Sequence, residues 1–409
     1  MAEHAARRIA LLTHSVNPRG GVVHVLELGR ALQAAGHEVT LIAPAARGQR
    51  FFRETPCRVS LAPLVPQADG TALADGVRAR IDAVRSHLRA LLRHQHFDVL
   101  HAHDGIGANA LADLQAEGLI DGYVRTVHHV DRFADAQVQA WEERSLREAR
   151  LLLCVSALWR RRLREQHGLA AHEVRNGVDP VRFSAAPQPA DAAVAHELGL
   201  WLADAEAAPR PAAGGRPASP LVLTVGGIEQ RKNTRRTLQA FARLRRQLPR
   251  AQLVVAGGAS VLDHAGEVAA FHAEAAAAGL AIGPGRPVVL LGPVPDAGMP
   301  ALYRSADVLA MPSLLEGFGL AALEALACGT RAVVSRIAPF TEHFGDGDVH
   351  WADPLDADSI ADALRAAVAL GRRAPPAVCS RFGWAESAQH HLALYGSPVR
   401  DTAPAREAA

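Results

Sequence analysis

The sequence is poor in aromatic residues and contains no long apolar run. Phe, Trp and Tyr together make up 5% of its 409 residues, so we expect a core built mainly from Val, Leu, Ile and Ala. Nowhere do about 18 apolar residues follow one another, which argues against a membrane-spanning helix. The N-terminal residues contain only a short apolar stretch in place of the longer core of a secretory signal. These absences predict a cytoplasmic protein.

A strong net charge and paired cysteines are also missing. The formal net charge is +2, which leaves no overall basic surface for nucleic acid. The four cysteines lie far apart and form no CxxC pair, which indicates a reducing compartment. The sequence has neither an HExxH pattern nor a Cys/His spacing typical of metal sites. We therefore expect no metal ligands and no cofactor.

The chain alternates apolar strands with helices, which is typical of an α/β protein with parallel sheets and right-handed crossovers. Its length suits two domains of about 180 residues each. The expected strands are Arg8–Thr13, Glu38–Ala43, Arg58–Ala62, Val99–Ala102, Tyr123–Val127, Leu151–Val155, Leu221–Val225, Gln252–Ala256, Val288–Leu291, Asp307–Met311 and Ala332–Ser335. Ligands of such sheets bind outside the carboxyl ends of the strands, so the loops that follow the strands are the places to look for a site.

The most informative of these loops lies in residues 309–335, LAMPSLLEGFGLAALEALACGTRAVVS. A strand is followed by Gly317-Phe318-Gly319-Leu320, where a helix is expected to begin. The start of a helix presents free backbone N–H groups and the positive end of the helix dipole, which favour a phosphate. Glu316 precedes the helix and Glu324 lies inside it, so we expect the two carboxylates to contact different parts of one extended ligand.

This segment resembles the E-x7-E signature of the family-4 retaining glycosyltransferases, and the resemblance extends over nearly all of residues 7–396. It implies the GT-B fold, in which two Rossmann-like domains with parallel sheets face each other across a cleft. Residues 185–219 are rich in Ala and Pro, a composition that predicts a linker or a mobile loop. The expected parts are an N-terminal acceptor-side domain (1–184), the linker (185–219), a C-terminal nucleotide-sugar domain (220–380), a helix that crosses back to the first domain (381–397) and a disordered tail (398–409).

The resemblance also implies roles for residues of the second domain. Lys232, in VGGIEQRKNT, is expected to bind the leaving diphosphate together with Arg231. Many family members have Arg where this chain has Gly227, so the role of Arg231 stays open, and a charge pair at the start of a helix can also be solvated surface.

The remaining donor contacts come from the glycine-rich loop and the helix after it. Backbone N–H groups near Gly319 and Leu320 are expected to bind the diphosphate. The resemblance implies that Glu316 binds the sugar hydroxyls and that Glu324 binds the ribose hydroxyls.

In the first domain, Gly20 and Gly21 follow the first strand and resemble glycines near the donor phosphates, although they could serve only a tight turn. His103, in VLHAHDG, resembles a histidine that reaches the transferred sugar and stabilises charge at the anomeric carbon, with a purely structural histidine as the alternative. We expect His101 to point to the opposite face of the sheet, which would keep the two from sharing a metal. His128 is expected on the acceptor side.

The predicted function is transfer of a hexosyl group from a nucleotide diphosphate sugar to a hydroxyl acceptor, with retention and without a metal. An epimerase of the same fold and a non-catalytic nucleotide-sugar-binding protein stay open as alternatives. The basic helix that carries Arg160–Arg164 could lie on anionic lipid, but a solvated face is favoured. The base, the sugar, the acceptor and the oligomeric state do not follow from the sequence.

Overall fold

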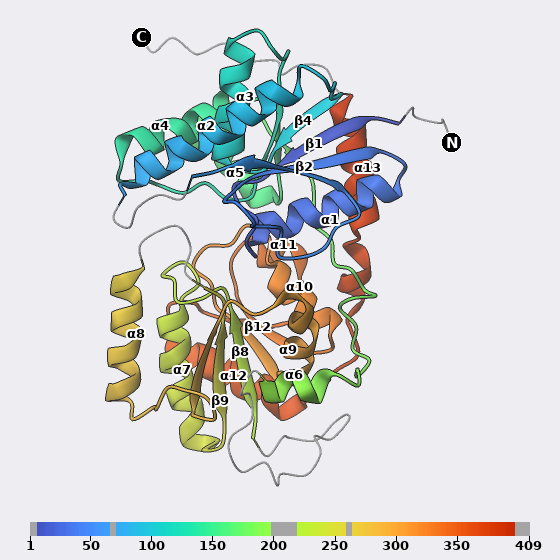
Figure 1. Ribbon diagram of the computed structural model, residues 1–409. Coiled ribbons are helices and arrows are strands. Elements are labelled where there is room, and N and C mark those ends of the chain that lie inside the picture. The colour runs from blue at the N-terminus through green and yellow to red at the C-terminus, as the bar shows by residue number, and fades with distance from the viewer. Residues whose placement is uncertain (1–5, 66–70, 198–218, 259–263, 397–409) are drawn as a thin grey trace. The chain divides into compact units, whose positions relative to one another are not determined.

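The computed structural model describes residues 6–65, 71–197, 219–258 and 264–396 (Figure 1). These residues form two compact units, each with its own parallel sheet. Unit 1 consists of the described residues of Met1–Gly177 and Gly383–Ala409, and unit 2 of those of Val178–Phe382. The first boundary lies earlier in the chain than the expected end at residue 184.

Unit 1 is built on a seven-stranded sheet in the order β3-β2-β1-β4-β5-β6-β7, and every pair of neighbouring strands is parallel. Its strands are β1 (Arg8–Leu12), β2 (Glu38–Ala45), β3 (Arg58–Pro63), β4 (Val99–Ala102), β5 (Val124–Val127), β6 (Leu151–Cys154) and β7 (His172–Glu173). Its helices are α1 (Gly20–Ala34), α2 (Leu73–Leu91), α3 (Gly105–Ala116), α4 (Ala136–Arg147), α5 (Ala157–His167) and α13 (Trp384–Tyr395).

The helices of unit 1 cover both faces of its sheet. The crossover through α1 leads from β1 to one side, and the crossovers through α2, α3 and α4 lead to the other, so right-handed connections place α1 on the opposite face from these three. The last helix, α13, packs against α1 (Figure 1). The carboxyl ends of β1 and β4, where the strand order reverses, therefore lie between two helical layers.

Unit 2 repeats this architecture with a six-stranded parallel sheet in the order β10-β9-β8-β11-β12-β13. Its strands are β8 (Leu221–Val225), β9 (Gln252–Ala256), β10 (Val288–Gly292), β11 (Val308–Met311), β12 (Arg331–Ser335) and β13 (His350–Ala352). Its helices are α6 (Asp191–Glu197), α7 (Thr234–Gln247), α8 (Ala265–Ala277), η1 (Asp296–Gly298), α9 (Met299–Ser305), α10 (Leu320–Ala327), α11 (Phe340–His343), α12 (Ala357–Leu370) and η2 (Ala377–Arg381). Helix α7 packs against both α8 and α12, and α9 contacts both α6 and α10 (Figure 1).

The two parallel sheets confirm the expected α/β class with Rossmann-like domains. The cores contain mainly Val, Leu, Ile and Ala, as the composition predicts. None of the helices within the described ranges combines the length and the apolar composition that crossing a membrane requires.

The main departure from expectation lies in the stretch 185–219. It contains the helix α6, which packs on α9 and is fixed by two hydrogen bonds of 2.7 Å from Arg304 to Asp191. The expectation of a linker did not include this helix, because its stability comes from that tertiary contact and not from the local composition. Residues 198–218 of the stretch, and the expected tail from 398 on, lie outside the described residues.

Candidate active site

Unit 2 brings two loops together at the point where its strand order reverses. Strands β8 and β11 are neighbours in the sheet although more than 80 residues of chain separate them. The loop after β8 carries Lys232, and the loop after β11 carries Glu316. Parallel strands end at the same edge of the sheet, so both side chains lie at its carboxyl edge, where ligands of such folds bind.

The central contact at this edge is a buried ion pair. The Lys232 ammonium donates a hydrogen bond of 2.8 Å to Glu316 Oε2, and both side chains are at most 13% exposed. The Arg231 guanidinium lies 3.7 Å from the other oxygen, Oε1, and 3.3 Å from the Glu229 carboxylate. We call Arg231, Lys232 and Glu316 the charge cluster. Glu229 is buried as well, so the two cations lie beside two buried carboxylates.

The surroundings of Glu316 keep its carboxylate charged. Burial by itself disfavours the charged form, but the nearby charges of Lys232 and Arg231 and the hydrogen bonds outweigh it and lower the pKa of Glu316. Ser313 Oγ lies 3.4 Å from Oε2, and the backbone N–H of Gly317 donates to Oε1 at 3.2 Å. A carboxylate held in this way has its position and its protonation state fixed before any ligand arrives.

Two glycines after β8, Gly226 and Gly227, allow neighbouring groups to pack closely next to the charge cluster. A Cβ on Gly226 would lie 2.8 Å from Lys232 Cε, so the lysine stem rests directly on this glycine. Gly227, where many family members have arginine, has φ +78°, and a Cβ there would lie 2.9 Å from the carbonyl oxygen of Gly258. This backbone therefore has no room for an arginine side chain at position 227, and Arg231 supplies the second cation of the cluster.

The glycine-rich loop leads directly into α10. Gly319 is the N-cap residue with φ +99°, and a Cβ there would lie 2.6 Å from Cε1 of Phe340. Phe318 is buried against His343, with ring centroids 4.3 Å apart, so it anchors the loop. Helix α10 begins at Leu320 and has no side-chain N-cap hydrogen bond. The N–H groups of Ala322 and Leu323 donate to the carbonyl oxygen of Gly319, and those of Leu320 and Ala321 can serve an anionic ligand.

Glu324, inside α10, has a partner that the sequence does not reveal. The hydroxyl of Tyr303 donates a hydrogen bond of 2.7 Å to Glu324 Oε2. Tyr303 is fully buried, and burial together with the Glu324 carboxylate raises its pKa well above the usual value. Tyr303 therefore stays protonated as a donor and orients the carboxylate. A tyrosine in the short helix α9 carries no motif that could have identified it.

The composition of the chain also draws attention to Lys232, independently of any motif. It is the only lysine in the chain, in which every other member of the 44 Lys and Arg residues is arginine. An ammonium is a compact point charge, whereas a guanidinium is planar and wider, so the two are not interchangeable in a confined site. The stem of this lysine, from Cγ to Cε, lies directly against Gly226.

Unit 1 gathers histidines at its own switch point, between β1 and β4. Gly20 and Gly21 start α1 directly after the β1 loop, and a Cβ on Gly21 would lie 3.5 Å from Cδ2 of His128. His103 follows β4, and its ring stacks on that of His128 with centroids 5.7 Å apart. Gly21 thus lies beside His128, and His128 lies beside the expected catalytic histidine.

The expectation that His101 and His103 point to opposite faces is wrong. Their ring centroids lie 4.1 Å apart. Residues two positions apart in an extended chain share a face, so the two histidines are neighbours. Both ring nitrogens of His101 are occupied, by the Tyr395 hydroxyl at 2.9 Å and by Thr126 Oγ1 at 2.8 Å. His101 is therefore a structural residue that joins β4 to α13.

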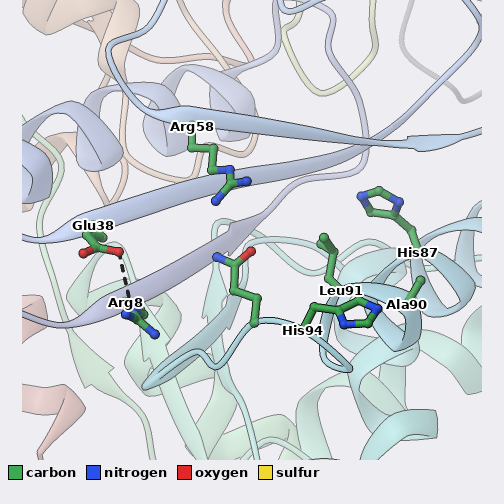
Figure 2. Close-up of a pocket in the computed structure, with 8 residues that line it drawn as sticks. Arg8, Glu38, Arg58, His87, Ala90, Leu91 and His94 are labelled. Carbon is green, nitrogen blue, oxygen red and sulfur yellow. Dashed lines mark ion pairs between the residues drawn. The ribbon is translucent and has the colours of Figure 1, made fainter.

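A separate hollow of about 450 Å³ lies elsewhere in unit 1 (Figure 2). Three of its lining residues, Arg8, Glu38 and Arg58, are the first residues of β1, β2 and β3, and Arg8 and Glu38 form an ion pair of 3.5 Å. The hollow is thus at the amino ends of the strands, the edge opposite to His103 and His128. Its shape alone gives no reason to prefer it over the loops at the carboxyl edge.

The basic helix α5 presents Arg160, Arg161 and Arg164 on its exposed side. Arg162 lies over the ring of the buried Trp159, 5.1 Å from its centroid, so it packs against its own helix.

Comparison with known proteins gives a consistent picture. The sequence model described as "Glycosyltransferase Family 4" matches residues 18–182, and that described as "Glycosyl transferases group 1" matches residues 209–375. The chain is 30% identical to the D-inositol 3-phosphate glycosyltransferase of Xylanimonas cellulosilytica, over 96% of this chain and 97% of the relative. It is 28% identical to the phosphatidyl-myo-inositol mannosyltransferase of Mycobacterium tuberculosis, over 93% and 94% of the two chains.

A solved structure supports the fold. The sucrose-phosphate synthase of Thermosynechococcus elongatus superimposes with a TM-score of 0.72 over 95% of this chain and 98% of that chain, at 22% sequence identity. At this identity the likeness concerns the GT-B fold alone.

Proposed function

This chain belongs to the family-4 glycosyltransferases, and we propose that it moves a hexosyl group from a nucleotide diphosphate sugar to a hydroxyl acceptor with retention at the anomeric carbon. The observation that carries the proposal is the charge cluster at the carboxyl edge of unit 2, beside the start of α10. It offers two cations and free backbone N–H groups where a diphosphate would lie.

Each residue of the site has a role in this proposal. Lys232, Arg231 and the backbone N–H groups near Gly319 and Leu320 stabilise the negative charge that grows on the leaving diphosphate. Glu316 binds the sugar hydroxyls and holds Lys232 in place. These contacts act on the part of the donor that changes charge during the reaction.

The other residues position the donor and the reacting carbon. Glu324, oriented by Tyr303, binds the ribose hydroxyls. In unit 1, His103 contacts the transferred sugar, while His128 and the glycines Gly20 and Gly21 line the substrate site.

The chemistry balances without a separate carboxylate base. The bond between the anomeric carbon and the diphosphate oxygen breaks, and its electron pair leaves with the diphosphate. The acceptor oxygen bonds to the same face of the anomeric carbon, and its proton passes to the departing phosphate oxygen. The enzyme has to stabilise positive charge on the sugar and negative charge on the diphosphate. Charged side chains and backbone dipoles that are already in position can provide this stabilisation. Glycoside hydrolysis differs, since two carboxyl groups flank the bond there.

The two alternatives have less support. Neither of the relatives named above nor the superimposed synthase is an epimerase, so nothing in the comparisons favours epimerisation. A binding protein without activity would not need His103 and Glu316 in addition to the donor contacts of Lys232 and Glu324.

A transfer assay in the presence of excess chelator tests the proposed function. The protein is incubated with uridine, guanosine or adenosine diphosphate sugars and with two first acceptors, inositol 3-phosphate and phosphatidyl-myo-inositol, which the names of the two relatives contain. We expect one donor to yield a glycoside with the donor's anomeric configuration, read by NMR, because the charge cluster supplies the positive potential that a divalent metal would otherwise provide.

Asp-x-Asp pairs, a common way to hold such a metal, do occur in this chain. In the structure Asp356 caps the backbone N–H of Asp358 at α12, and Asp348 accepts from the N–H of Gly345. These carboxylates serve local turns. Loss of transfer in chelator that Mg²⁺ or Mn²⁺ restores would contradict metal independence, and an inverted product would contradict retention.

Lys232→Ala should lower turnover by at least about 10²-fold, because a charge-assisted contact that strengthens as the diphosphate leaves acts mainly on the transition state. Lys232→Arg is the matched control, since it keeps the charge but not the compact shape. We expect it to retain the fold and donor binding and to lose much of the turnover. Steady-state kinetics and calorimetry measure both effects. Wild-type turnover in Lys232→Ala would place this lysine outside the site.

Glu316 and Glu324 should respond differently to replacement by glutamine. The ribose does not change during the reaction, so Glu324→Gln should raise the donor KM with little change in kcat. Tyr303→Phe, which removes only the hydrogen bond to Glu324, should act in the same direction and more weakly. Glu316→Gln should reduce kcat more than donor binding. The reverse pattern would mean that the two carboxylates have exchanged roles, and two variants like the wild type would mean that the motif is structural.

A further inference from the structure

Three histidines of unit 1 converge from three separate elements. His24 lies in the middle of α1, His103 follows β4, and His128 follows β5. One ring nitrogen from each lies within 4.8 Å of the others. The ring centroid of His24 is 5.0 Å from that of His103 and 4.7 Å from that of His128. We call these three residues the histidine triad.

Buried nitrogens of the triad lack hydrogen-bond partners among the described residues. They are Nε2 of His24, both ring nitrogens of His103, and Nε2 of His128. His24 is fully buried and His103 is 4% exposed. A buried polar atom without a partner costs free energy, so several of them facing one another indicate a missing ligand.

The hydrogen bond of His24 sets its tautomer. Nδ1 of His24 lies 2.9 Å from Oδ1 of Asn176, which can only accept, so Nδ1 carries the proton and donates it. The lone pair of His24 is therefore on Nε2, the atom without a partner. A metal-bound histidine typically donates its second ring N–H to an oxygen in this way, which fixes the ring and raises its basicity as a ligand.

The charge state also suits metal binding. Burial, followed by the neighbouring His391, lowers the pKa of His24 to about 3, and burial together with the surrounding histidines lowers that of His103 well below its usual range. The imidazoles are thus neutral at pH 7, and the neutral ring is the form that binds a metal.

We propose that His24, His103 and His128 form a binding site for a late first-row divalent cation, with Zn²⁺ as the best fit. Three imidazoles suit zinc, copper and nickel, and three protein ligands leave the fourth position of tetrahedral zinc to water. Zinc–nitrogen bonds of about 2.0–2.1 Å require ligand atoms roughly 3.3 Å apart, so the rings contract around the ion by small side-chain rotations. His128 is only half-buried and provides the route of entry.

The site has a consequence for catalysis, which rests on the proposed function. His103 is the residue proposed to contact the transferred sugar, and a bound cation would engage its ring. Zn²⁺ should therefore inhibit transfer, and a chelator should leave transfer intact or raise it. The histidine triad is accordingly an inhibitory site formed by residues of unit 1, whereas the charge cluster is formed by residues of unit 2.

The test measures binding directly on protein without a histidine tag. The protein is stripped with chelator and titrated with ZnCl₂ by calorimetry, and Co²⁺ is added separately to read the visible absorption of a four-coordinate complex. We expect one ion per chain with a dissociation constant on the order of 1 µM, because the ligands are neutral and no carboxylate joins them. Replacing His24, His103 or His128 singly by glutamine should weaken binding by at least about 10²-fold, and Asn176→Ala should weaken it by about 10-fold to 100-fold.

His101→Asn is the matched control. It removes a buried histidine whose ring lies 4.1 Å from that of His103 but whose nitrogens are both occupied, so it should leave zinc binding unchanged. Near-ultraviolet circular dichroism verifies that each variant is folded, and a rise in the melting temperature of the wild type with Zn²⁺ gives a second measure of binding that does not depend on any variant.

The outcomes separate the site from the proposed function. No saturable binding by the wild type, or equal binding by the folded triad variants, would overturn the site. Binding that His101→Asn weakens as strongly as His24→Gln would overturn the assignment of ligands. Stoichiometric binding without inhibition of transfer would support the site and contradict the proposed role of His103.

Discussion

The ion pair between Lys232 and Glu316 is the interaction on which the rest of the site depends. A buried ion pair adds little to stability, because removing two charges from water offsets most of their attraction. Its value here is positional. The pair holds a compact cation at the edge of the sheet, beside the start of α10, and Gly226 leaves space for the lysine stem. A diphosphate that binds there finds a cation already in place, which limits the reorganisation needed during the reaction.

Much of the fold could be predicted from the sequence, because long apolar strands and helices that end at glycine are strong local signals. Strand β8 was expected at Leu221–Val225 and is observed there, and β9 likewise matches its expected range of Gln252–Ala256. Short elements were missed. Strand β13 has three residues, too few for a periodic pattern, and its pairing with β12 is what defines it. Helix α6 depends on Arg304, more than 100 residues away in the chain.

Part of the candidate site could likewise be predicted from local sequence, and the rest depends on tertiary contacts. The loop that contains Glu316 and Gly319 is a contiguous motif, so the sequence identifies it as a candidate anion site. The pairing of Glu316 with Lys232 follows from strand order, which places β8 beside β11. His24 gave no sign of function, because a histidine inside an amphipathic helix resembles any other core residue. Its meeting with His103 and His128 joins the helix of the first crossover to the loops after β4 and β5, and no spacing rule covers such a set.

Because Lys232 is the only lysine, its chemistry can be followed without interference from other side-chain amines. Reductive methylation with formaldehyde, read by peptide mass spectrometry, gives the labelling rate of this ammonium group. It should be measured with and without the uridine, guanosine or adenosine diphosphate that calorimetry shows to bind. If the charge cluster holds the diphosphate, the bound nucleotide will protect Lys232, and the corresponding nucleoside will not. An unchanged labelling rate at saturating nucleotide would show that the diphosphate binds elsewhere and would contradict the account.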